Sequence, residues 1–196
     1  MWSSPLFWMV FAIVVFWALG AYNRLIRLRS AVAQAFGGFD AHLVRLVALL
    51  GEFNAAQATQ RATLLDGNDQ TMAALQGATT QLSACLAVAR ARPMAVDAVA
   101  ALAASRDVLH AAWHAATRQT RDEPYDGSQD TSEFTNTDPA VRTPSIWDVR
   151  WDEHALQNEQ AARVLNDAVA YYNAAIAQFP ANLLAWVFGF KAARGL

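Results

Sequence analysis

The sequence predicts an all-α protein in which an N-terminal transmembrane helix continues into an antiparallel four-helix bundle. Residues 1–23 contain no charged side chain. Further along, large apolar residues recur at steps of three and four, which is the spacing of one face of a helix. Alanine, the residue with the highest helix propensity, occupies 42 of the 196 positions. No alternating run of β-branched residues competes with a helical interpretation.

The apolar segment at the N-terminus has the length of a membrane span. About 20 helical residues, at 1.5 Å each, cover the roughly 30 Å of a hydrocarbon core. Trp2 and Tyr22 stand near the two ends of the segment, where amphipathic rings favour the membrane interface. We therefore assign residues 1–23 to a transmembrane anchor and residues 24–196 to the helical bundle.

A cleavable signal peptide is the alternative interpretation of the same segment. Ala18-Leu19-Gly20 offers the small residues of a cleavage site, but no Lys or Arg precedes the apolar run. We therefore expect an uncleaved signal-anchor. Arg24, Arg27 and Arg29 follow the span, and Lys and Arg are retained on the cytoplasmic side. This asymmetry predicts a single-pass protein with a cytoplasmic bundle, and the opposite orientation is the alternative.

Four apolar stripes predict the helices of the bundle. The first runs without a break from the span to about residue 60, with the spacing typical of a coiled coil, and the turn residues Asp66–Asp69 end it. The second covers residues 72–89, the third residues 95–119 and the fourth residues 165–179. We expect the first stripe to be buried at Leu25, Leu28, Val32, Phe36, Phe39, Leu43, Leu46, Leu50 and Phe53.

Two segments depart from this pattern. Residues 120–150 are polar and are interrupted by Pro and Gly, and the six acidic residues from Asp122 to Asp138 have no basic residue among them. This composition predicts a loop. Residues 181–196 begin with a very apolar stretch that is too short to span a bilayer. We expect it to dock on the bundle or to lie at the membrane surface.

Both ends of the chain carry a recognisable pattern. After the span the sequence reads Tyr22-Asn23-Arg24-Leu25-Ile26-Arg27-Leu28-Arg29. Near the C-terminus it contains Asn158-Glu159, Ala162-Arg163, Asn166, Tyr172-Asn173, Ile176 and Phe179-Pro180. Together these residues resemble the bacterial LemA family, in which a membrane helix runs into Y-N-x-L-x-x-L-R and a last helix ends in Y-N-x-x-I-x-x-F-P. The match covers about residues 1–50 and 156–190.

The resemblance implies a four-helix bundle on one N-terminal membrane helix of a bacterial protein. With the flanking charge, we expect a single-pass protein of the bacterial inner membrane with the bundle in the cytoplasm, and a periplasmic bundle is the alternative. No enzymatic activity is established for the family; some relatives take part in magnetosome membrane formation and others lie beside membrane proteases. Asn23, Asp40, Arg163 and Asn173 are polar positions shared with the family pattern. We expect them to fix the register of the helices through hydrogen bonds or ion pairs.

Motifs for catalysis are missing from the sequence, which has no phosphate-binding G-x-x-x-x-G-K-S/T and no G-x-S-x-G. The net charge of −2 argues against a nucleic-acid partner. Asp107, His110 and His114 share one helical face, but Ala111 stands where a metalloprotease would carry Glu. We predict no catalytic, cofactor or metal site, and a metal-dependent enzyme using these three residues is the alternative. Cys85, the single cysteine, is expected to be a small core residue.

These observations predict a membrane-anchored scaffold or interaction module without enzymatic activity. Its expected partners are the lipid bilayer and a protein of unknown identity. The alternative is an accessory or regulatory subunit of a membrane-bound enzyme such as a protease. In that case the contact would be made by the apolar terminal segment or by the acidic loop.

Overall fold

The computed structural model describes residues 5–61, 69–122, 145–179 and 181–196, which form five helices and no strand. The helices are α1 (Pro5–Arg61), α2 (Asp69–Ala91), α3 (Val96–Asp122), α4 (Ile146–Ala177) and α5 (Ala181–Phe188). This architecture confirms the predicted all-α bundle with a long apolar helix at its N-terminus.

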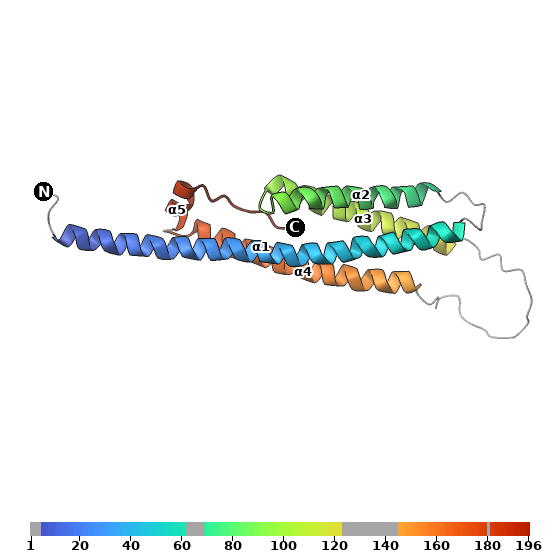
Figure 1. The fold of residues 1–196 in the computed structure, drawn as a ribbon, viewed down its shortest axis with the longest axis horizontal. Coiled ribbons are helices and arrows are strands. Elements are labelled where there is room, and N and C mark those ends of the chain that lie inside the picture. Colours follow the sequence, from blue (N-terminus) through green and yellow to red (C-terminus); the bar gives the residue numbers. More distant parts are fainter. Residues whose placement is uncertain (1–4, 62–68, 123–144, 180) are drawn as a thin grey trace, which may run out of the picture.

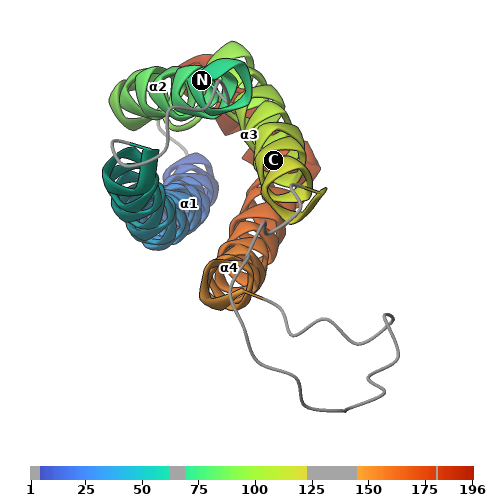
Figure 2. The ribbon, with the colours of Figure 1, turned by 90° about the vertical axis from the view of Figure 1, so that its right-hand side faces the viewer.

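The bundle consists of two antiparallel helix pairs. α1 packs along α4, α2 packs on α3, and α1 also contacts α2. In Figure 1, α1 and α4 run in opposite directions, with the α2–α3 hairpin beside them. The view along the bundle in Figure 2 shows the four long helices around a common centre. The N-terminal part of α1 projects beyond the other helices (Figure 1).

One apolar core extends through the bundle. Eight of the nine positions expected from the first stripe are buried, and Leu28 is partly buried. At the distal end, where α1 finishes and α4 begins, Trp113 stacks on Trp151 with ring centroids 4.5 Å apart. Phe53 meets Trp113 edge-on at 5.0 Å. Aromatic pairs of this geometry contribute roughly 0.5–1.5 kcal/mol beyond their buried area, so they join three helices at this end.

The fourth stripe ends earlier than the sequence predicts. Leu165, Val169 and Tyr172 are buried as expected, but Phe179 is 82% exposed. The reason is that α4 ends at Ala177 and the backbone becomes extended at Gln178, with φ −82° and ψ 139°. Phe179 therefore leaves the helical register that would have brought its ring into the core.

The segment between α3 and α4 is shorter at both ends than the loop predicted at residues 120–150. α3 continues to Asp122, and α4 begins at Ile146. Ser145 caps α4: its Oγ accepts a hydrogen bond from the Asp148 N–H, while the Asp148 carboxylate accepts one from the Ser145 N–H. This capping box satisfies donors that have no partner within the helix, which explains why α4 starts so soon after the polar segment. Residues 123–144, with five of the six acidic residues, lie outside the described part of the chain.

α1 passes through Gly37-Gly38 without interruption. A Cβ added at either glycine would meet no atom within 4 Å. These glycines therefore open no close contact between helices, and they lower the helix propensity of an otherwise regular segment.

Candidate membrane-proximal site

The apolar part of α1 is not covered by the rest of the protein. Its most apolar 18-residue window has a mean hydropathy of 2.0, and none of that window is buried. Among the described residues this is the one helix that is long and apolar enough to cross a membrane. Its side chains, among them Phe7, Phe11 and Ile13, are exposed.

The short helix α5 lies beside the last turns of this apolar segment. Tyr22 of α1 contacts Phe188, with ring centroids 5.1 Å apart, and Phe190, at 6.3 Å. One helical turn or more toward the N-terminus, Trp17 contacts Phe179 at 5.8 Å. The terminal segment thus docks on the bundle, which is one of the two placements expected from its sequence.

The outer surface of α5 is strongly apolar. Trp186 is 82% exposed. Four further large apolar side chains at this corner of the molecule are also exposed: Phe179, Leu183, Val187 and Phe188. A group of exposed apolar side chains next to an uncovered apolar helix is typical of surfaces that bind a partner or a membrane.

Hydrogen bonds from α4 hold the chain after α5. Asn173 donates its side-chain N–H to the carbonyl oxygen of Ala193 at 2.8 Å and accepts from the Ala193 N–H at 2.9 Å. Two helical turns earlier, Asn166 makes the same pair with Leu196, at 3.3 Å and 2.7 Å. Tyr172 adds a bond from its hydroxyl to the carbonyl oxygen of Lys191 at 3.1 Å. We call these three side chains and their bonds the tail clamp.

Two glycines allow the chain to reach the tail clamp. Gly189 has φ +70°, a conformation that favours glycine, and the Phe190 N–H donates to the Ala185 carbonyl oxygen at 2.8 Å. This is the Schellman pattern that ends a helix and reverses its direction. At Gly195 a Cβ would collide with the side chain of Asn166. The tail can therefore approach α4 closely only because no side chain intervenes.

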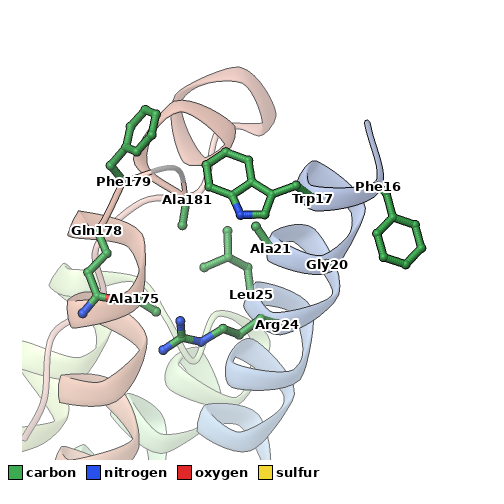
Figure 3. A pocket seen from close by; sticks show the side chains of 10 residues that line it. All are labelled: Phe16, Trp17, Gly20, Ala21, Arg24, Leu25, Ala175, Gln178, Phe179 and Ala181. Atoms are coloured by element: carbon green, nitrogen blue, oxygen red, sulfur yellow. The ribbon is translucent and has the colours of Figure 1, made fainter. Parts of the chain in front are cut away.

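A groove lies between α1 and the corner at which α4 gives way to α5 (Figure 3). Its volume is about 370 Å³. The lining residues are Phe16, Trp17, Gly20, Ala21, Arg24, Leu25, Ala175, Gln178, Phe179 and Ala181. Figure 3 shows Arg24 extending from α1 toward the end of α4, while Trp17 lies at the opposite end of the groove, near Ala181. We call this feature the membrane-proximal groove.

Basic side chains gather around the same end of the molecule. Residues 1–39 and 168–196 contain no Asp or Glu, and their charged side chains are Arg24, Arg27, Arg29, Lys191 and Arg194. A second hollow, of about 350 Å³, includes Arg29 and Lys191 in its lining, with Tyr22 and Phe188. On α1 the first acidic residue is Asp40, on α4 the last is Asp167, and Asp97 lies in the first turn of α3. These two segments therefore carry only positive side-chain charges in an otherwise slightly acidic protein.

The three residues of the metal hypothesis do not form a site. Among the described residues, no three His, Cys, Asp or Glu side chains lie close enough together to hold a metal ion. Asp107 and His114 are exposed on α3, whereas the His110 ring packs edge-on against Trp151 at 5.2 Å. Burial, with a smaller effect from Arg106, lowers the pKa of His110 below its usual 6.5. His110 therefore belongs to the aromatic end of the core.

The polar positions shared with the family pattern have different roles. Asp40 accepts a hydrogen bond from the Arg90 Nε at 2.7 Å and so joins α1 to α2. Asn173 belongs to the tail clamp. Arg163 pairs with a glutamate one turn earlier in the same helix, and Asn23 is exposed. A polar contact between helices, as expected, is therefore present at Asp40, whereas Asn173 holds the non-helical C-terminal segment instead of a second helix.

Sequence reasoning missed two features of the interior. Asn158 is buried in α4, and its side-chain oxygen has no hydrogen-bond partner in the described structure. The tail clamp was also not foreseen, because its backbone partners have no signature in side-chain spacing. Cys85 lies as predicted, partly buried against the core.

No protein-family model, no curated protein and no solved structure matches this chain. The fold and the membrane-proximal site therefore carry the functional argument.

Proposed function

We propose that the protein is a single-pass protein of the bacterial inner membrane whose helical bundle acts as a scaffold or interaction module and performs no catalysis itself. The observation that supports this proposal is the continuity of α1. The same helix that is apolar and uncovered near residue 5 becomes one of the four helices that line the core of the bundle from Leu25 onward. A helix of this kind transmits its orientation directly from the bilayer to the bundle.

The position of α5 supports the same proposal. The apolar stretch from Pro5 to Asn23 has a helical length of about 28 Å, close to the roughly 30 Å of a hydrocarbon core. Trp17, which contacts Phe179, lies about 9 Å from the charged end of that stretch, measured along the helix. Interfacial helices are buried by about 5–10 Å. Tyr22, which contacts Phe188 of α5, lies at the charged end itself. The apolar corner from Phe179 to Phe188 therefore reaches from that end to about 9 Å inward, the depth range of an interfacial helix, when α1 spans the bilayer.

We further propose that the chain is a LemA-family member with its bundle in the cytoplasm. Asn166, Tyr172 and Asn173, which belong to the family pattern, jointly hold the chain after α5. The basic residues that follow the span favour the cytoplasmic side by charge. A phosphatase fused after Leu196 should therefore be inactive and a fluorescent reporter active, and the reverse result refutes this orientation.

Membrane extraction tests the anchoring. The full-length protein should stay in the membrane fraction through alkaline washing and should keep its original N-terminus. The double variant Val10→Arg/Val14→Arg places two charges in the span, at about 2.5–3.5 kcal/mol each, and should release the protein. Val44→Arg/Val88→Arg is the matched control, because these valines are similarly exposed but lie on the bundle. Release of the wild-type protein with a new N-terminus near Ala21 would show a cleaved signal peptide instead.

Crosslinking in intact membranes tests the interaction role. A photoreactive side chain at Trp186 should capture lipid, whereas one at Val108, exposed on α3, should capture a protein partner if the bundle is a scaffold. Capture of one membrane-bound enzyme in equal amounts with the protein favours the accessory-subunit alternative. Recovery of the bundle uncrosslinked to any protein, at every exposed position tested, contradicts the proposal.

A further inference from the structure

We propose that the membrane-proximal groove binds one anionic glycerophospholipid, with the headgroup phosphate on the Arg24 guanidinium and an acyl chain along the apolar wall. This inference rests on the proposed membrane anchoring and specifies a ligand that the anchored protein holds. It goes beyond anchoring because the span alone needs no particular lipid.

The shape and lining of the groove suit an acyl chain. A volume of about 370 Å³ lies within the roughly 300–1,000 Å³ of small-molecule pockets. Trp17, Ala21 and Leu25 form one wall, and Ala175 and Phe179 contribute to the other. These side chains offer no hydrogen bond except the Trp17 indole N–H, so they match a hydrocarbon rather than a polar ligand.

The position of Arg24 suits a phosphate. Arg24 is the first charged residue after the apolar stretch, so its guanidinium lies at headgroup level when α1 spans the bilayer. Within the described structure it makes no ion pair, and Figure 3 shows it reaching across one end of the groove. Gln178, on the opposite side, carries a second set of N–H donors. Arginine binds phosphate with two parallel hydrogen bonds.

The surrounding charge selects an anionic headgroup. A zwitterionic lipid carries an ammonium group that gains from a nearby carboxylate. Residues 1–39 and 168–196 supply five basic side chains and no carboxylate side chain to this end of the molecule. An additional negative charge on the headgroup is therefore favoured, and a positive charge is disfavoured. Phosphatidylglycerol satisfies this requirement, whereas phosphatidylcholine does not.

Native mass spectrometry of the full-length protein in detergent tests the proposal. Phosphatidylglycerol and phosphatidylcholine are added separately, and bound lipids are counted for each variant. Wild-type protein should retain one phosphatidylglycerol and lose phosphatidylcholine readily. Arg24→Gln should weaken phosphatidylglycerol binding about fivefold, which corresponds to about 1 kcal/mol for one basic residue at an anionic membrane surface. Arg45→Gln is the matched control, because Arg45 is exposed on the same helix but far along the bundle.

A second variant fills the groove without removing charge. Gly20→Leu adds a side chain where a Cβ meets no atom within 4 Å, and leucine has a higher helix propensity than glycine. This variant should fold normally and lose the phosphatidylglycerol that the wild type retains. Equal retention of the two lipids by the wild type, or unchanged binding in Arg24→Gln and Gly20→Leu, refutes the proposal. Displacement of the lipid by inorganic phosphate alone at millimolar concentration also contradicts it, because the acyl chain would then contribute nothing.

The alkaline wash separates this proposal from the anchoring proposal. Arg24→Gln and Gly20→Leu should both remain in the membrane fraction, because the span is intact. Loss of lipid selectivity with retained anchoring overturns only the lipid site. Release of the wild-type protein from the membrane overturns the proposed function itself.

Discussion

Replacing Asn173 by Ala tests whether the tail clamp fixes α5 against the span. The substitution removes two hydrogen bonds to the Ala193 backbone, of 2.8 Å and 2.9 Å, and leaves that N–H and carbonyl without their partner. A typical bond contributes about 1 kcal/mol net, and an unsatisfied buried group costs about 1–3 kcal/mol. We therefore expect the tail to lose about 2–3 kcal/mol of local stability. Its opening equilibrium should rise about 30- to 150-fold, since 1.4 kcal/mol is a factor of ten.

Amide hydrogen exchange of the full-length protein measures this local opening directly. The amides of Ala193 and Leu196 should exchange faster by that factor, while core amides such as that of Leu43 stay protected. Asn182→Ala is the matched control, because Asn182 is exposed at the start of α5. Tail exchange that stays within about twofold of wild type, or that rises equally in the control, refutes the assignment of the clamp to Asn173.

Three further predictions concern the stability of the bundle and are read from denaturation midpoints. Gly37→Ala should stabilise α1 by up to about 1 kcal/mol, because the added Cβ meets no atom within 4 Å. Gly195→Ala should destabilise the tail, because its Cβ collides with the Asn166 side chain of α4. A shift of the denaturation midpoint in the same direction for both variants would contradict this. The pKa of His110 is lower in the folded protein than in the unfolded chain, so on acidification the unfolded chain binds a proton at a higher pH than the folded protein does. The contribution of the neutral His110 to the free energy of unfolding is therefore fully present above pH 6.5 and is lost as the pH falls below it. His110→Gln should reduce this loss of stability at low pH. His114→Gln, at an exposed position of the same helix, is the control. A pH dependence of stability in His110→Gln that is identical to wild type would contradict the prediction. Asn158→Leu should be neutral or stabilising by about 1 kcal/mol, because it removes a buried oxygen without a partner; a clear loss of stability would reveal a hydrogen bond there.

The sequence predicted the helices well because their signal is local. A stripe such as Val32, Phe36, Phe39 and Leu43 needs only the helical period to identify a buried face, and all four are buried. Helix ends were less accurate. Phe179 continues the period of α4 in sequence but not in space, because the backbone becomes extended one residue earlier.

The membrane-proximal site was predictable only in part. The apolar character of residues 181–196 indicated docking or a membrane surface, but not which part of α1 it would meet. That placement depends on Asn173 and Asn166 binding backbone groups 20 and 30 residues away in sequence. A side chain that recognises a peptide group leaves no trace in the residue type of its partner. The membrane-proximal groove depends on the same long-range placement.

The unbroken course of α1 sets a distance as well as an orientation. From Arg24 to Arg61 the helix measures about 55 Å, and no described turn or linker interrupts it. Phe53, which contacts the stacked tryptophans, lies 29 residues after Arg24. If α1 spans a bilayer and stands upright, those rings are therefore about 44 Å above it and the end of α1 about 55 Å above it. A molecule that engages this end must itself reach that height, which favours a soluble protein or a tall membrane complex over a partner lying flat on the lipid. Shortening α1 by whole turns would lower that meeting point by about 5.4 Å per turn.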